Sequence, residues 1–187
     1  MADIDAPRGT PFAHGNERRV LTDGTASLKD AVQTLRWLWR LDGPPQGILC
    51  VGTDRSTGDA LGPLVGTELQ TKVPRLKVWG TLDRPVHAAN LADVLRSNPD
   101  LSQTRVMAVD ASLGKLEDVG TLLIGPGPLH PGSGVNKQLP PLGRYHMTGT
   151  VNVGGFMEYF VLQNTRLALV MHMASFIALA LADSLGP

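Results

Sequence analysis

Short apolar runs alternate with segments of helical periodicity over most of this chain. A typical run is GILCVG at residues 47–52, which has no polar face and therefore predicts a strand buried on both sides. The segments between such runs repeat apolar residues every three or four positions, which predicts helices. Strands are expected at 47–52, 75–81, 104–111, 118–127 and 148–154, and helices at 27–41, 60–72, 87–97 and 155–185.

This alternation predicts an α/β fold class. We expect a three-layer α/β/α sandwich, in which a mostly parallel sheet of about five strands lies between helices. Ser27 and Asp30 are spaced like a capping box at the start of the first helix. We divide the chain into an N-terminal extension, residues 1–45, with a mobile start and the helix at 27–41, and an α/β domain, residues 46–187.

Composition and charge narrow the classes of protein that fit. The 17 Lys and Arg balance the 17 Asp and Glu, which argues against a protein held to nucleic acid by phosphate contacts. The N-terminus has no apolar signal-peptide core. His172 and Ser175 interrupt the longest apolar stretch on one helical face, which predicts a core helix and not a membrane span. We expect a soluble cytoplasmic protein without nucleic-acid or membrane partners, in which the single cysteine, Cys50, is buried.

Polar residues collect directly after the predicted strands, where parallel α/β folds form their sites. Asp59 lies in the glycine-rich loop after the first strand, and Asp110 ends the apolar run VMAVD. A carboxylate at the tip of a buried strand is costly unless another group compensates it, so Asp110 is the stronger candidate. The residues expected to shape a pocket around these acids are Thr53, Asp54, Arg55, His87, His130, Ser133 and Lys137.

Several of these residues also have an ordinary structural interpretation. Asp59 precedes a predicted helix and is placed to be its N-cap. Asp54 and Arg55 are placed to form a surface ion pair. His87 fits the first turn of a helix, and His130 fits a plain loop.

Two aspartates on adjacent loops have a defined chemical use. Close like charges do not both ionise cheaply, so one acid keeps its proton near neutral pH while the other stays a carboxylate. Such a pair activates water and protonates a leaving group, which is peptide hydrolysis by acid–base catalysis. With a histidine added, the same oxygens are suited to a divalent metal. A Ser-His-Asp triad is not favoured, because no Gly-x-Ser-x-Gly motif is present and Ser133 lies in a glycine loop.

The motifs TGDALGP, VMAVDASLG and HPGSGV, in this order, resemble those of the germination protease that degrades small acid-soluble spore proteins. The longer segments GTDRSTGDALGPLVG, GTLDRPVHAANL, HPGSGVNKQLPPLG and VNVGGFMEYFVLQNTRLALVMHMA are similar to motifs of the sporulation protein YyaC family, over about residues 48–178. Both groups resemble the hydrogenase maturation proteases in fold. The resemblance implies a peptidase-like three-layer domain and a role in sporulation.

The resemblance also implies roles for the two acids. Asp59 matches the acid of the DALGP motif, and Asp110 matches the aspartate that ends an apolar strand. In hydrogenase maturation proteases the acids at these places bind nickel together with a histidine. Here His87, His130 and His146 are the choices for the third ligand, so we name no metal ligand, and the cofactor stays unknown.

The leading hypothesis is a sporulation-associated peptidase of the forespore or mother-cell cytoplasm, which uses Asp59 and Asp110 on peptides or spore proteins. Two alternatives stay open. One is a non-catalytic sporulation protein that binds a partner or peptide, and the other is a metal-dependent processing protease. A homo-oligomer is compatible with each of these hypotheses.

Overall fold

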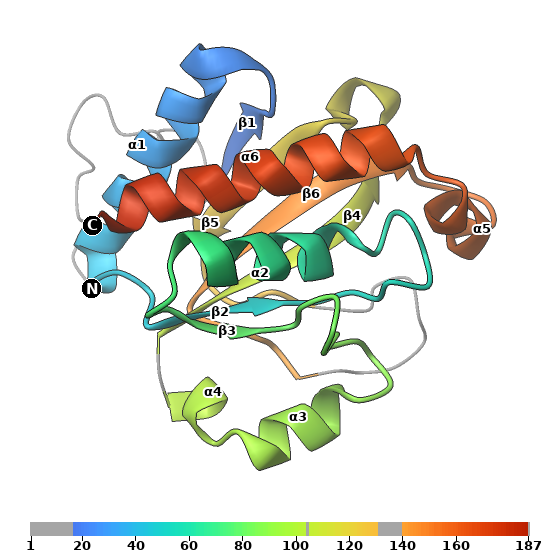
Figure 1. Cartoon of the computed structure of the whole chain (residues 1–187). Helices are drawn as coiled ribbons and strands as arrows, with labels where there is room; N and C mark the ends of the chain where they lie inside the picture. Colours follow the sequence, from blue (N-terminus) through green and yellow to red (C-terminus); the bar gives the residue numbers. More distant parts are fainter. Residues whose placement is uncertain (1–16, 104, 131–139, 187) are drawn as a thin grey trace, which may run out of the picture.

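The computed structural model describes residues 17–103, 105–130 and 140–186, which form one sheet with helices on both faces (Figure 1). The strands are β1 Arg18–Leu21, β2 Gly47–Cys50, β3 Lys77–Trp79, β4 Val106–Gly114, β5 Thr121–Pro126 and β6 Tyr145–Val153. The helices are α1 Gly24–Asp42, α2 Leu61–Lys72, α3 Leu91–Ser97, α4 Asp100–Gln103, α5 Glu158–Gln163 and α6 Leu167–Leu185, with a 3-10 turn, η1, at Leu116–Asp118. The predicted three-layer α/β/α sandwich is confirmed.

The strands lie in the order β1-β5-β6-β4-β2-β3. Parallel pairing joins β3, β2, β4 and β6, whereas β5 runs antiparallel to both β6 and β1. The sheet is therefore mostly parallel, as predicted. Its six strands exceed the expected five because β1 was missed: its sequence, RRVL, is only 4 residues long and begins with two arginines.

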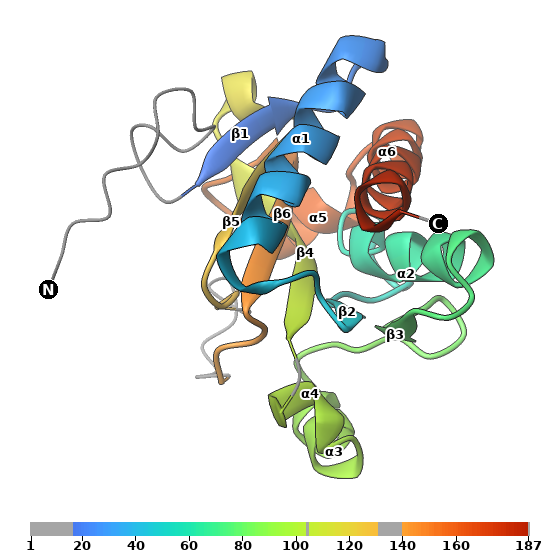
Figure 2. The same cartoon turned by 90° about the vertical axis from the view of Figure 1, so that its left-hand side faces the viewer.

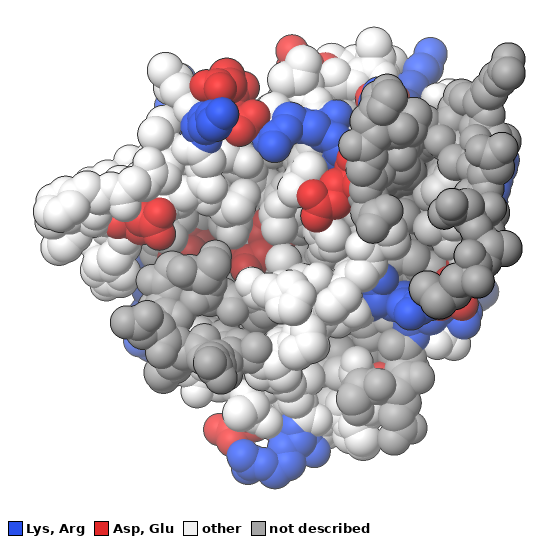
Figure 3. Space-filling view, turned by 180° about the vertical axis from the view of Figure 1, so that it is seen from behind, with Lys and Arg blue, Asp and Glu red and all other residues white. Residues whose placement is uncertain are grey.

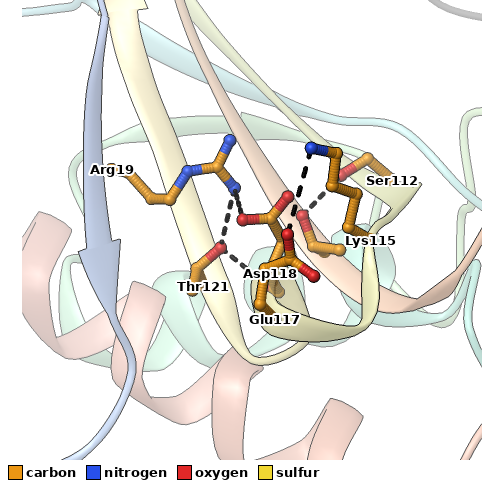
Figure 4. Close-up of polar contacts among 7 residues, drawn as sticks. Arg19, Ser112, Lys115, Glu117, Asp118 and Thr121 are labelled. Carbon is orange, nitrogen blue, oxygen red and sulfur yellow. Dashed lines mark hydrogen bonds and ion pairs between the residues drawn. The ribbon is translucent and has the colours of Figure 1, made fainter.

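The segment before residue 46 contributes to the same sheet and core as the rest of the chain. Val20 of β1 and Leu35 of α1 are buried in the main hydrophobic cluster. Arg19 ties β1 to its neighbours: its guanidinium lies 2.9 Å from the carboxylate of Asp118 and donates a hydrogen bond of 3.3 Å to the hydroxyl of Thr121 (Figure 4). The loop at residues 42–47 thus connects parts of one packed unit.

The start of α1 differs from the predicted capping box. The helix begins at Gly24, and the cap position is Asp23, which makes no side-chain bond to the helix backbone. Ser27 donates its hydroxyl to Asp23 at 3.0 Å, and Asp30 binds Arg18 of β1 at 3.1 Å. Tertiary pairing with β1 has taken the side chain that the capping box would use.

The sheet separates two hydrophobic clusters. Cys50 and Val109 face the larger one, which α1, α2 and α6 cover, whereas Leu49 and Ala108 face a smaller one beside α3 and α4 (Figures 1 and 2). Successive residues of β2 and β4 therefore enter opposite cores, which explains their continuous apolar sequence. Burial raises the pKa of the Cys50 thiol far above its ordinary value, so this residue is the buried small hydrophobe that was predicted.

Helix α6 is long and apolar enough to cross a membrane, and half of its most apolar window is buried within this fold. Met173 and Ile177 are buried in the main cluster, where α6 packs against α1 and α2. His172 and Ser175 are on the exposed side. The prediction of a core helix with one polar stripe is confirmed.

Two glycines allow α2 to approach the end of β2 closely. Gly52 has a φ of +145°, and a Cβ atom there would lie 2.0 Å from the carbonyl oxygen of Asp59. A Cβ atom on Gly62 would lie 2.0 Å from the carbonyl oxygen of Val51. Since any larger residue would push these backbones apart, both glycines fix the loop that connects β2 to α2.

Candidate active site

The loop of residues 53–59, which we call the 53–59 loop, is held by main-chain hydrogen bonds. The amide of Thr53 donates to the carbonyl of Asp59 at 3.2 Å and closes the loop on itself. The amide of Gly58 donates to the carbonyl of Leu162 at 2.9 Å and joins the loop to α5. These bonds give the carboxyl group of Asp59 a defined position at the end of the sheet.

Asp110 lies on β4 just beyond the end of β2. Cys50, the last residue of β2, is paired with Val109, and Asp110 is paired with Thr148 of β6. The side chain of Asp110 is half-buried, and its Oδ1 accepts a 2.8 Å hydrogen bond from the amide of Ala111. The carboxyl group therefore stands at a corner where one neighbouring strand has ended and the other continues.

The two acids influence each other. Burial raises the pKa of Asp110 to about 8, the hydrogen bond from Ala111 lowers it, and the negative charge of Asp59 raises it further. Burial also raises the pKa of Asp59. Within the described residues, no Lys, Arg or His forms an ion pair with either carboxyl group. Because the shift is larger for Asp110, this acid holds the proton of the pair at neutral pH.

Asp59 does not act as the N-cap of α2, so that interpretation is wrong. The cap position is Ala60, which makes no side-chain hydrogen bond to the helix and whose amide donates to the carbonyl of Ser56 at 2.9 Å. The buried hydroxyl of Ser56 lowers the pKa of Asp59, although it reaches full hydrogen-bond geometry with no described atom. The carboxylate of Asp59 therefore does not cap the N-terminus of α2.

Thr53 and His87 belong to loops at the same end of the sheet as the two acids. The Thr53 hydroxyl accepts the amide of Arg55 at 3.3 Å and shapes the 53–59 loop. Val86 forms a β-bridge with Val51, so His87, which is half-buried, follows directly on the end of β2. Both residues border the acidic corner by their place in the backbone.

The other predicted pocket residues are not joined to the acids. Asp54, Arg55 and His130 are exposed, and no hydrogen bond or ion pair links them to either acid in the described part of the chain. The expected surface pair of Asp54 with Arg55 does not form there either. Ser133 and Lys137 lie outside the described residues.

Two residues near the acids were missed from the sequence. Ser56 stands in a run of polar residues, and only the packing of the 53–59 loop buries it, to 5% exposed. Thr148 faces Asp110 because β4 and β6 are paired in that register. The signal for Thr148 was a polar residue inside a predicted strand, but the register between distant strands cannot be derived from one sequence.

The histidines give no third metal ligand in the described residues. His146 is buried, with Nε2 at 2.9 Å from the carboxylate of Glu17 and Nδ1 at 3.1 Å from the carbonyl of Gly127. No group of three His, Cys, Asp or Glu side chains suited to a metal occurs among residues 17–103, 105–130 and 140–186. The described geometry thus provides two carboxyl groups and no complete nickel site.

A hollow is visible on the face opposite to that of Figure 1. Figure 3 shows acidic atoms deep inside it, and the described side chains that border them are mainly uncharged. A recessed acid among uncharged neighbours loses part of its hydration, which is the cause of a raised carboxyl pKa.

The chain is similar in sequence to a known protein family. The family model described as "Protein of unknown function (DUF1256)" matches residues 26–180. The chain belongs to this family. Protein YyaC of Bacillus subtilis (strain 168), described as uncharacterized, is 51% identical over 166 residues, which cover 87% of this DUF1256 chain and 81% of the relative. The predicted resemblance to the YyaC family is confirmed.

A solved structure shares the architecture of this DUF1256 domain. The nickel–iron hydrogenase maturation protease HycI from Thermococcus kodakarensis KOD1 superimposes with a TM-score of 0.52 and 19% identity, over 81% of this chain and 99% of that protein. At this identity the likeness establishes the fold alone. The relation to the germination protease stays a prediction.

Proposed function

We propose that this protein is a peptidase in which Asp59 and Asp110 act together on one water molecule and one peptide bond. The observation that carries the proposal is the state of Asp110: it is buried enough for a pKa of about 8, and a second carboxyl group with no cationic partner among the described residues lies near it. Acid pairs of this kind are the working parts of acid–base hydrolysis.

The chemistry follows from the different proton affinities of the two acids. The carboxylate of Asp59 accepts a proton from water, and the resulting hydroxide attacks the peptide carbonyl carbon. The carboxylic acid of Asp110 protonates the carbonyl oxygen as it becomes a hydroxyl group. When the tetrahedral intermediate collapses, Asp59 gives its proton to the departing amine and Asp110 recovers a proton from the hydroxyl group. Both acids then return to their starting states.

The resemblance of the DALGP and VMAVD motifs to those of the germination protease supports peptides or spore proteins as substrates. The same resemblance supports a role in sporulation, in the cytoplasm of the forespore or mother cell. A hydrolase that acts there needs no cofactor beyond water if the acid pair is sufficient.

The test compares the wild-type protein with variants that lack one of the two acids. Wild-type protein is incubated with acid-soluble spore proteins and with a broad peptide library, and new termini are identified by mass spectrometry. We expect cleavage by the wild type, and none by the Asp59→Asn and Asp110→Asn variants. Cleavage that survives both substitutions would refute the proposal.

Two further results separate the alternatives. If an Asp110→Asn protein captures peptides that the wild type binds but never cleaves, the domain is a non-catalytic binding protein. If cleavage stops with a chelator and returns with nickel or zinc, a metal-dependent protease is the better description. Activity unchanged by chelators agrees with the acid pair.

A further inference from the structure

Large apolar side chains are exposed together around α5. Phe156 is 89% exposed, Tyr159 65%, Phe160 52% and Met157 50%, and we call these four residues the α5 knob. The rings of Tyr159 and Phe160 meet edge to face with centroids 5.6 Å apart, so these two side chains form one continuous apolar surface. Soluble proteins rarely leave such a group in water unless it binds something.

A groove of about 1200 Å³ lies between the first half of α1 and the C-terminal ends of α2 and α6, and we call it the α1–α6 groove. This volume is above the ~300–1,000 Å³ typical of small-molecule sites and fits a protein segment better. Its apolar lining residues are only partly buried by their own chain, and they are Leu28, Val32, Val73, Leu76 and Leu185.

The lining of the groove carries an excess of positive charge. Its basic residues are Lys29, Arg36, Lys72 and Arg75, and its one acidic residue is Asp183. Arg36 donates to the main-chain carbonyl of Asp183, which leaves its charge without a carboxylate partner. Lys29 and Arg75 form no ion pair within the described residues. The groove therefore favours an apolar segment with negative charge.

The α5 knob has the matching properties. Residues 152–164 include large apolar side chains and a single charged residue, Glu158. Figure 1 places α5 at one end of the molecule and the C-terminus, where α6 meets the groove, at the other. The knob of one molecule is thus far from its own groove but free to enter that of another.

We propose that the α5 knob of one copy of this chain docks into the α1–α6 groove of a second copy. Because the two surfaces are different, the contact is head-to-tail, and it leaves a free knob and a free groove at the ends of the assembly. Association then continues into open chains or closes into a ring. This contact does not depend on the chemistry of Asp59 and Asp110.

The first experiment measures the molar mass of the full chain by light scattering over a wide range of protein concentrations. We expect the wild-type mass to rise from that of the 19.9 kDa chain to beyond twice that value. A Phe156→Lys variant removes the most exposed ring of the knob and adds a charge that the basic groove repels. A Lys29→Glu, Arg75→Glu variant reverses the charge of the groove. Since all three residues are exposed, both variants should fold, and both should remain monomeric. A Leu116→Glu variant is the matched control, because Leu116 is 76% exposed outside both surfaces, and it should associate like the wild type.

Mixing the two variants gives the decisive result. The knob variant still has a groove, and the groove variant still has a knob, so an equimolar mixture should form a dimer that cannot grow further. A wild type that is monomeric at every concentration overturns the proposal. It is also overturned if the wild type associates while the knob or groove variant associates equally, or if the mixture stays monomeric, since another surface or another partner must then be responsible.

Discussion

Asp110 and Asp118 follow each other closely along the chain, yet their surroundings are opposite. The carboxylate of Asp118 lies 2.9 Å from the guanidinium of Arg19, and its main-chain carbonyl accepts the hydroxyl of Thr121 at 2.7 Å (Figure 4). Asp110 is paired with no cation among the described residues, and it meets an amide and the field of a second acid. A cation neutralises the carboxylate of Asp118, whereas the carboxyl group of Asp110 lies near a second acid.

The contrast separates an acid that holds the fold from an acid that is suited to chemistry. The chain has as many Lys and Arg as Asp and Glu, so cations are available. One of them, Arg19, stabilises the junction of β1 and β5, and none among the described residues pairs with Asp110. A site that keeps a buried acid unpaired is costly for stability, and this cost is typical of catalytic positions. The following substitutions test the contrast, from the largest expected effect to the smallest.

Substitution of Asp59 or Asp110 should have the largest effect on activity. In the Asp59→Asn and Asp110→Asn variants, peptide cleavage should fall by about 10²–10⁴-fold, the usual range for loss of one general acid or base. The Asp118→Asn variant should keep its kcat, since Asp118 serves the fold. Steady-state kinetics on one cleaved peptide measure all three. Equal losses in the three variants would remove the distinction.

The pH dependence of stability should also distinguish the two acids. The pKa of Asp110 is raised in the folded protein from an ordinary 3.8 to about 8, so ionisation opposes folding. As pH rises between these values, the wild type should lose stability relative to Asp110→Asn, and the difference in stability should not change with pH below or above this range. Urea midpoints across this range measure it. Activity should decline above pH about 8, where Asp110 loses its proton. A gap that narrows with rising pH would contradict the assignment.

Displacing the 53–59 loop should destabilise the fold around Asp59 and Asp110 while both acids are kept. A Gly52→Ala substitution places a methyl group 2.0 Å from the Asp59 carbonyl oxygen, and such overpacking should lower the free energy of unfolding by about 1–3 kcal/mol. Gly155→Ala is the matched control, since its φ of +140° is similar and nothing lies within 4 Å of its Cβ position. Urea unfolding should show a larger loss for Gly52→Ala than for the control.

Removing the ion pair of Arg19 with Asp118 should have the smallest effect on stability. An Arg19→Ala substitution removes a half-exposed ion pair, which should reduce the free energy of unfolding by at most about 1 kcal/mol. Cleavage should be unchanged. A loss of activity without a loss of stability would show that this junction takes part in the chemistry.

Much of the fold was predictable because its inner strands are apolar on both faces. The run VMAVD predicted both β4 and the importance of its last acid, since a strand that is buried up to Val109 makes the next residue conspicuous. The pairing of β1 with β5 was not predictable, because the four residues of β1 carry too little pattern and their partner is far along the chain. For the same reason the capping box at Ser27 was wrong: Arg18 binds the acid that would have completed it.

The assignment of Asp59 and Asp110 as site residues stays a prediction, and the surroundings of the two acids could not be derived from the sequence. The motifs placed Asp59 and Asp110 on adjacent loops, whereas the buried hydroxyl of Ser56 and the register of Thr148 depend on contacts between distant segments. Asp59 also looked like a helix cap, and only the backbone of Ala60 shows that the helix starts without it.

The hydrogen bond from Gly58 to Leu162 has a consequence for biosynthesis. Leu162, which anchors the 53–59 loop, is translated more than half a chain length after Gly58. Strand β6, which pairs with β4 beside Asp110, is also translated late. Before these parts are made, the burial that raises the pKa values of the two acids is incomplete. The folded arrangement of Asp59 and Asp110 therefore forms only after most of the chain has been translated.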